Sequence, residues 1–121
     1  MQKFDLPHNH GGEIGKILSH LPSLEDFITV SELLGLLGDA SRLRIFWLLC
    51  HCEECVINIS AAVKMSSPAV SHHLQKLKSS GLVTSRRDGK EVYYTACDTP
   101  LVKELHNVLE TISAVSCPTQ N

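Results

Sequence analysis

The amino-acid sequence predicts a mainly α-helical protein with one small β-hairpin, an α+β fold of modest size. Three observations support this fold class. Apolar residues recur at spacings of three and four along most of the 121 residues, as they do in amphipathic helices. Two short stretches on either side of residue 89 alternate with period two, as strands do. The dipeptide Asp88-Gly89 separates these stretches and is a strong signal for a tight hairpin turn.

The first 22 residues predict an N-terminal arm. They contain four residues that interrupt long helices, Pro7, Gly11, Gly12 and Pro22. We expect at most a short helix there, from Glu13 to Leu21. Residues 23–117 are expected to form the folded domain. No segment has the apolar core of a signal peptide or the length of about 20 apolar residues that a membrane span needs, so we expect a soluble cytoplasmic protein.

Two helices are predicted next. Ser23 caps the first, whose apolar residues are Phe27, Val30, Leu34 and Leu37, and Gly38 ends it. Asp39 caps the second. On its inner side we expect Leu43, Cys50 and either Phe46 or Trp47, whereas Arg42 and Arg44 are expected to project from it.

A helix-turn-helix follows. A short helix from Val56 to Lys64 is expected to make its apolar contacts through Ile57, Ile59, Ala62 and Val63. In the next helix we expect Ser67 as the cap and Pro68 at the first helical position. Its apolar face is Val70, Leu74 and Leu77, and Gly81 ends it. The opposite face is polar and basic, as a helix in the major groove of DNA requires, and it carries Ser71, His72, Gln75, Lys76, Lys78 and Ser79.

The hairpin completes a winged helix-turn-helix, because it comes directly after this recognition helix and has a basic tip. From Lys64 to Glu91 the chain has six basic and two acidic residues, a net charge of +4, while the rest carries −6. We expect base edges or nearby phosphates to be approached by Ser71, His72, Gln75 and Lys76, and the DNA backbone to be bound by Ser66, Ser67, Arg86, Arg87 and Lys90. His73 is expected to be partly packed.

The last predicted helix has a heptad seam. Asp98 and Thr99 cap it, and its apolar residues follow at spacings of four and three, at Leu101, Leu105, Val108, Ile112 and Val115. Such a seam favours a partner helix over packing in the same subunit, so we expect a homodimer in which Phe27 and Leu34 of the earlier helix complete the interface. We expect a two-fold symmetric dimer to bind double-stranded DNA at a palindromic operator.

The chain resembles a known family over about residues 24–116, and three segments carry the resemblance. They are LGDASRLRIFWLL, CVINISAAVKMSSPAVSHHLQKLKSSGLV and SRRDGKEVYYTACD. These segments are similar to the ArsR/SmtB family of bacterial metal-sensing repressors. The resemblance implies a homodimeric winged helix-turn-helix that binds DNA without a ligand and releases it when an inducer binds. It implies no enzymatic activity, and the chain has no phosphate-binding loop, zinc-protease motif or nucleophile elbow.

One family sensor site lies on the last helix, and most of its ligands are absent here. Asp98 matches the first ligand, but the other three positions are occupied by Pro100, Thr111 and Ala114. We therefore reject that site in its usual form. His106 and Glu110 stand four residues apart and could bind a metal weakly, although we expect a solvated polar face there.

The other family site lies before the helix-turn-helix, where relatives often have a C-x-C segment. Cys55 matches the first thiol and Ile57 replaces the second, but Cys52 supplies a C-x-x-C spacing. Two such thiolates can reach one tetrahedral ion. In relatives with this site the N-terminal arm adds ligands, and here the arm offers His8 and His10. We therefore expect Zn²⁺, Cd²⁺ or Pb²⁺ as inducer, with Cys50 and His51 as alternative ligands, although Cys50 better fits the core.

Two alternatives remain open for the thiols. Cys52 and Cys55 could respond to oxidants or reactive sulfur species by forming a disulfide. The repressor could also have no inducer, with thiols that are only structural. Cys97 and Cys117 have no evident partner in the sequence.

Overall fold

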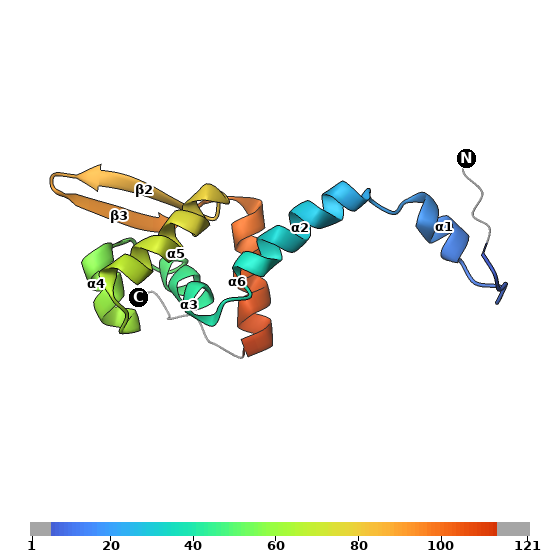
Figure 1. Ribbon diagram of the computed structural model, residues 1–121, viewed down its shortest axis with the longest axis horizontal. Helices are drawn as coiled ribbons and strands as arrows, with labels where there is room; N and C mark the ends of the chain where they lie inside the picture. Colours follow the sequence, from blue (N-terminus) through green and yellow to red (C-terminus); the bar gives the residue numbers. More distant parts are fainter. Residues whose placement is uncertain (1–5, 114–121) are drawn as a thin grey trace. The chain divides into compact units, whose positions relative to one another are not determined.

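The computed structural model describes residues 6–113, which fall into two compact units. One unit extends to Glu32 and the other begins at Leu33, so the boundary lies within α2. The arm of residues 1–22 and the domain of residues 23–117 remain our prediction of the domain organisation. Within the described residues the elements follow in the order α1 (Ile14–Ser19), α2 (Leu24–Leu36), α3 (Ala40–Leu49), β1 (Glu54–Cys55), α4 (Val56–Val63), α5 (Ser67–Ser79), β2 (Val83–Asp88), β3 (Glu91–Ala96) and α6 (Pro100–Ser113) (Figure 1).

The core of the second unit lies where α3, α4, α5 and α6 meet the base of the β2–β3 hairpin. The predicted apolar face of α5 is confirmed, since Val70, Leu74 and Leu77 are fully buried. They pack with side chains from the other elements, namely Ile45, Phe46, Leu49, Ile59, Val63, Leu82, Val83 and Val102. The helix-turn-helix and the wing are therefore anchored on one continuous core, with their polar faces outward.

The caps of the helices follow the sequence signals in most cases. Ser23 and Asp39 accept backbone N–H bonds at the starts of α2 and α3, at 3.2 and 2.9 Å. Thr99 does so for α6. Our assignment for α5 was wrong by one residue: Ser66 is the cap, and its Oγ accepts from the Ala69 N–H. Pro68 accordingly occupies the second helical position rather than the first.

Two predictions about side-chain direction were wrong. Arg42 does not project into solvent: it is 7% exposed and donates to the carbonyl oxygen of Leu36, which lies at the end of α2. This bond satisfies an open C-terminal carbonyl of one helix with a side chain from the next. On α4, Ile57 and Ala62 are exposed, and Ser60 takes the inward position because its hydroxyl bonds to the Val56 carbonyl oxygen.

The sheet has three antiparallel strands, in the order β1-β3-β2. The hairpin is confirmed, but Asp88 pairs with Glu91, so its two-residue loop is Gly89 and Lys90. Gly89 has a φ of +63°, which favours glycine. The sequence reading missed β1, in which Cys55 pairs with Tyr93 and Glu54 with Tyr94. The thiol-containing segment is thus part of the same sheet as the wing.

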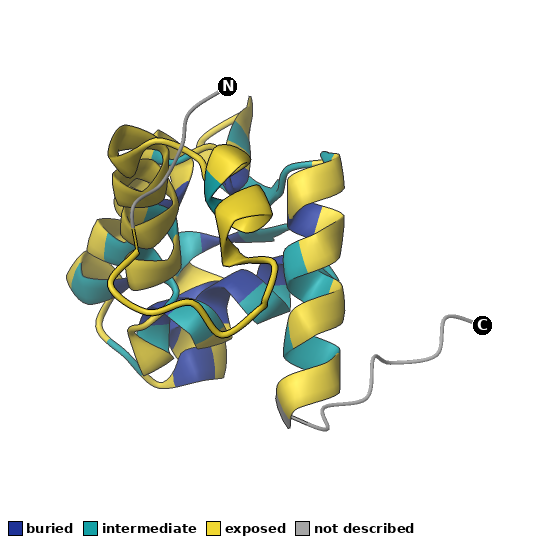
Figure 2. Cartoon of the chain, turned by 90° about the vertical axis from the view of Figure 1, so that its right-hand side faces the viewer, coloured by how far each residue is buried: buried dark blue, intermediate teal, exposed yellow. Residues whose placement is uncertain are grey.

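Helix α6 stands against the end of α3 and the rest of the core along one side only. Val102 is buried, and Leu105 and Leu109 pack against the core. Most of the rest of its surface is exposed (Figure 2). None of the described helices is both long and apolar enough to cross a membrane.

Candidate DNA-binding surface and metal ligands

The outer face of α5 presents the predicted base-reading residues. All of them are exposed, namely Ser71, His72, Gln75 and Lys76. The helix begins at an exposed end where Ser66 and Ser67 lie, and the Ser67 hydroxyl is 3.2 Å from that of Ser60 on α4. This contact joins the two helices at their turn. Because a helix N-terminus carries partial positive charge, this end of α5 also suits a phosphate.

The base of the wing is linked directly to α5. The Lys78 ammonium on α5 donates to the Ser85 hydroxyl on β2, at 2.7 Å. Gln75, Lys78 and Ser79 line a shallow depression with Tyr94 of β3. The recognition helix and the wing therefore form one continuous polar surface.

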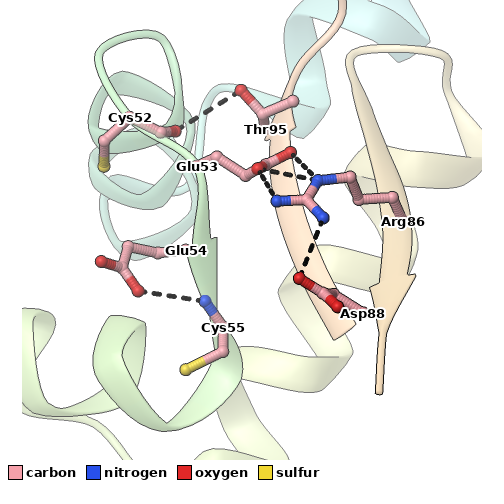
Figure 3. A network of polar contacts seen from close by, with 7 residues as sticks. All are labelled: Cys52, Glu53, Glu54, Cys55, Arg86, Asp88 and Thr95. Carbon is pink, nitrogen blue, oxygen red and sulfur yellow. Dashed lines mark hydrogen bonds and ion pairs between the residues drawn. The ribbon is translucent and has the colours of Figure 1, made fainter. Parts of the chain in front are cut away.

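The three basic residues of the wing differ in their surroundings. Arg87 and Lys90 are exposed and take part in none of the ion pairs between described residues. Arg86 instead binds the Glu53 carboxylate through Nε and Nη2, and Asp88 lies 3.8 Å from its Nη1 (Figure 3). Its guanidinium also lies over the Tyr93 ring, 4.9 Å from the centroid. The predicted DNA contact at Arg86 is thus already occupied by an acidic residue of the thiol segment.

The two thiols lie at either end of this short acidic segment. Cys52 follows α3, and its Sγ points to the Leu48 carbonyl oxygen, at 3.4 Å. Burial, and then the charge of Glu54, raises the pKa of the Cys52 thiol. Cys55 is buried and its N–H bonds to the Glu54 carboxylate. In Figure 3 the Glu54 side chain lies between the two sulfur atoms, so we infer that joint coordination of one ion requires the segment to rearrange.

The proposed arm ligands belong to the other compact unit. The rings of His8 and His10 stack with their centroids 5.7 Å apart. Both histidines are exposed. The four-ligand set of Cys52, Cys55, His8 and His10 remains a prediction.

A different group of metal-ligating side chains is assembled within the second unit, and sequence reasoning did not find it. It consists of His51, just after α3, with His106 and Glu110 of α6. The His51 and His106 Nε2 atoms are 3.0 Å apart, and Glu110 Oε1 lies 2.9 Å from His106 Nε2. Our expectation of a solvated polar face for His106 and Glu110 was wrong, because their side chains are only 21% and 20% exposed. The four-residue spacing of His106 and Glu110 was the signal in the sequence for this group. Nothing in the neighbouring sequence indicated that His51 joins them.

The predicted dimer surface is apolar and exposed where the structure describes it. On α6, Leu101, Val108 and Ile112 are 48%, 48% and 78% exposed. On α2, Phe27 and Leu34 are also exposed. Leu105 instead packs against the core of its own subunit, and Val115 lies outside the described residues.

Comparison with known proteins is consistent with this geometry. The family model described as "Bacterial regulatory protein, arsR family" matches residues 39–85, from the α3 cap to the first residues of β2. A transcriptional repressor SmtB homolog of Synechocystis sp. is 38% identical over 94 residues, which are 78% of this chain and 71% of that protein. The cadmium resistance transcriptional regulatory protein CadC of Listeria innocua is 38% identical over 86 residues, 70% of this chain and 71% of that protein.

A solved structure shows the same architecture. It is the solution structure of a homodimeric winged helix-turn-helix DNA-binding domain from Mycobacterium bovis, described as a possible ArsR-family regulator. It superposes with a TM-score of 0.65 at 29% identity and covers 78% of this chain and 88% of that one.

Proposed function

Because the chain belongs to the ArsR family of bacterial regulatory proteins, we propose that it is a repressor that leaves its operator when a soft or borderline metal ion binds. The chain is a transcriptional regulator of the winged helix-turn-helix type, not an enzyme. Its place of action is then the cytoplasm, where the operator DNA lies.

The DNA is bound by a homodimer in this proposal. The exposed seam of Leu101, Val108 and Ile112 on α6 meets a second copy of the chain, together with the exposed face of α2. A two-fold axis then places two α5 helices about 34 Å apart, one turn of the duplex, over a palindromic operator. Each α5 reads base edges through Ser71, His72, Gln75 and Lys76, while Arg87 and Lys90 of the wing bind phosphates.

The inducing metal is bound by Cys52 and Cys55 and completed by His8 and His10. Thiolate and imidazole ligands suit Zn²⁺, Cd²⁺ and Pb²⁺, so the donor set fits a tetrahedral ion of this class. The name of one relative, a cadmium resistance transcriptional regulatory protein, supports the same class of inducer. Binding must displace the Cys52 thiol proton and its contact with the Leu48 carbonyl oxygen.

One structural observation carries the proposed coupling between metal and DNA. Glu53, which lies between the two thiols in sequence, binds Arg86 of the wing, and the backbone of Cys55 pairs with Tyr93 on β3. A rearrangement of residues 52–55 around an ion therefore moves the wing and changes the freedom of Arg86. Such a coupling is reciprocal. If metal weakens the binding of DNA by some factor, DNA must weaken the binding of metal by the same factor.

The test measures operator affinity by fluorescence anisotropy, with a promoter fragment from beside the gene. Titrations without metal and with Zn²⁺, Cd²⁺ or Pb²⁺ are compared under reducing conditions. We expect at least one ion to weaken binding tenfold or more, which corresponds to about 1.4 kcal/mol of coupling. The double variant Cys52→Ser/Cys55→Ser should bind DNA normally and lose this response.

Cys97→Ser is the matched control, because Cys97 is a partly exposed thiol outside the 52–55 segment. It should respond to metal as the unmodified chain does. Release by metals that survives in the double variant would contradict the thiol site. Tight DNA binding that is indifferent to all three ions but responds to oxidants would contradict the metal inducer and favour the redox alternative.

A further inference from the structure

We propose that His51, His106 and Glu110 form a metal site of their own, which takes a borderline divalent ion such as Zn²⁺ or Co²⁺ and ties α6 to the end of α3. His51 lies more than fifty positions before His106 and Glu110 in the sequence. They converge because Leu105 and Leu109 seat α6 on the core while the chain leaves α3 at His51. The site shares no ligand with the proposed thiol site.

The spacing of the three ligand atoms fits one tetrahedral ion. The two Nε2 atoms are 3.0 Å apart, and Glu110 Oε1 lies 2.9 Å from His106 Nε2 and 3.8 Å from His51 Nε2. A circle through three points at these separations has a radius of about 1.9 Å. Three corners of a tetrahedral site with bonds of about 2.0–2.1 Å lie on a circle of about 1.9–2.0 Å. One ion can therefore reach all three atoms without a large movement of either helix.

The chemistry of the three atoms also calls for a cation. Each neutral imidazole presents either a proton or a lone pair at Nε2, and the carboxylate presents only lone pairs. Protons on both Nε2 atoms would face each other across 3.0 Å, so at least one of the two nitrogens presents a lone pair there. A divalent ion accepts a lone pair from each of the three atoms at once.

Trp47 holds two members of the group in place. Its indole N–H donates to Glu110 Oε1, at 3.4 Å, and its ring packs on that of His51 with centroids 4.4 Å apart. Neighbours of this kind orient metal ligands and are a regular part of protein metal sites. The three ligand side chains are also only 16–21% exposed, which protects a bound ion from competing water.

Two imidazole nitrogens and one carboxylate oxygen select a borderline ion rather than the softest ones, with a fourth position left for water or another ligand. An ion here would restrain His51, which directly precedes the Cys52–Cys55 segment and hence the Glu53–Arg86 pair. Any effect of this ion on operator release rests on the proposed function. The binding of the ion does not, and it is tested without DNA.

The experiment measures Co²⁺ binding to the full chain by visible absorption, with Zn²⁺ competition to obtain the affinity for Zn²⁺. The starting protein carries Cys52→Ser, Cys55→Ser, His8→Gln and His10→Gln, so that the proposed thiol site contributes no ligand. We expect one Co²⁺ per chain with a ligand-field spectrum of nitrogen and oxygen ligands. Adding His106→Gln or Glu110→Gln should weaken binding at least tenfold. His20→Gln, at an exposed histidine of the other unit, is the matched control and should change nothing.

A thermal melt of each variant separates loss of the site from loss of the fold. Without metal, Glu110→Gln should melt as a folded protein, and Zn²⁺ should raise the melting temperature of the starting protein but not of this variant. The proposal is overturned if His106→Gln and Glu110→Gln both bind Co²⁺ as the starting protein does. It is also overturned if the starting protein binds no Co²⁺, since the three residues would then form a hydrogen-bonded cluster only. Failure of metals to release DNA would contradict the proposed function and leave this result unchanged.

Discussion

Glu53 and Arg86 form a two-pronged ion pair that joins the thiol segment to the DNA-binding wing. Arg86 Nε lies 2.9 Å from both carboxylate oxygens, and Nη2 contacts one of them as well. The hydrogen bond from Arg86 lowers the pKa of Glu53, so the carboxylate stays ionised throughout the neutral range. The same guanidinium edge cannot bind Glu53 and a DNA phosphate in this geometry at once.

Removing the charge of Glu53 should therefore strengthen DNA binding. We expect Glu53→Gln to raise operator affinity by roughly two- to fivefold at low salt, the range of an exposed ion pair, because Arg86 becomes available to phosphate. The gain should shrink at higher salt. Anisotropy titrations measure it. Glu91→Gln removes an exposed acidic charge from the same wing and should have the smaller effect. Weaker binding by Glu53→Gln would mean that Glu53 positions Arg86 for DNA.

The basic tip of the wing should contribute to affinity without contributing to sequence preference. Arg87→Ala and Lys90→Ala should each weaken binding to all duplexes alike and reduce the slope of log affinity against log salt by about 2, since each substitution removes one phosphate contact from both subunits of the dimer. Gln75→Ala on α5 should instead reduce the preference for the operator over an unrelated duplex. Competition titrations at several salt concentrations distinguish the two patterns. An unchanged salt slope in both wing variants would remove the wing tip from the proposed interface.

The exposed seam of α6 should hold the dimer together. Val108→Glu and Ile112→Glu place a charge in this apolar surface, so we expect both variants to be folded monomers by sedimentation equilibrium and circular dichroism. Ile57→Glu is the matched control, because Ile57 is 67% exposed but lies on α4. It should remain dimeric. Dimers of unchanged stability in both α6 variants would place the interface on another surface.

Stability should depend on pH through His73. Burial is the main cause that lowers its pKa from 6.5, and its Nδ1 atom is buried without a hydrogen-bond partner. The nearby charges are Asp39, which raises the pKa, and Arg42, His72 and Lys76, which lower it. Since the unfolded chain binds the proton more readily, the stabilisation is fully present above about pH 6.5 and is lost as the pH falls through the lowered pKa.

The measurement is the free energy of unfolding between pH 7 and pH 5. We expect it to fall with pH, and to fall less steeply in His73→Gln. Burial also lowers the pKa of His51, so part of the slope should remain in that variant. A slope as steep in His73→Gln as in the unmodified chain would contradict this account.

Much of the fold could be predicted because its signals are local. Caps such as Asp39, the apolar spacing of Val70, Leu74 and Leu77, and the hairpin signal at Asp88-Gly89 each depend on neighbouring residues in the sequence. The strand β1 escaped prediction because two residues are too few to show a period. Arg42 was misplaced because the carbonyl oxygen that it binds becomes available only where α2 ends against α3.

The candidate sites were harder to predict, because most of their contacts join residues that are far apart in the sequence. The polar face of α5 and the basic tip of the wing could be read from spacing and charge. The convergence of His51 on His106 and Glu110 depends on how α6 packs beside α3, and no local rule relates positions so distant in sequence. The Glu53–Arg86 pair was missed likewise, since it follows from the registers of β1 and β2 against β3.

The pairing of β1 with β3 has one further consequence. The chain enters this sheet at Glu54 and leaves it at Ala96, and everything proposed to touch DNA lies between these two points. Entry and exit are neighbours, since Glu54 stands opposite Tyr94. Residues 54–96, which contain the proposed DNA contacts, therefore form a segment whose two ends lie side by side in the sheet. The proposed metal ligand Cys55 lies at the start of this segment, so the inducer site and the DNA-reading residues are joined through the same pair of strands.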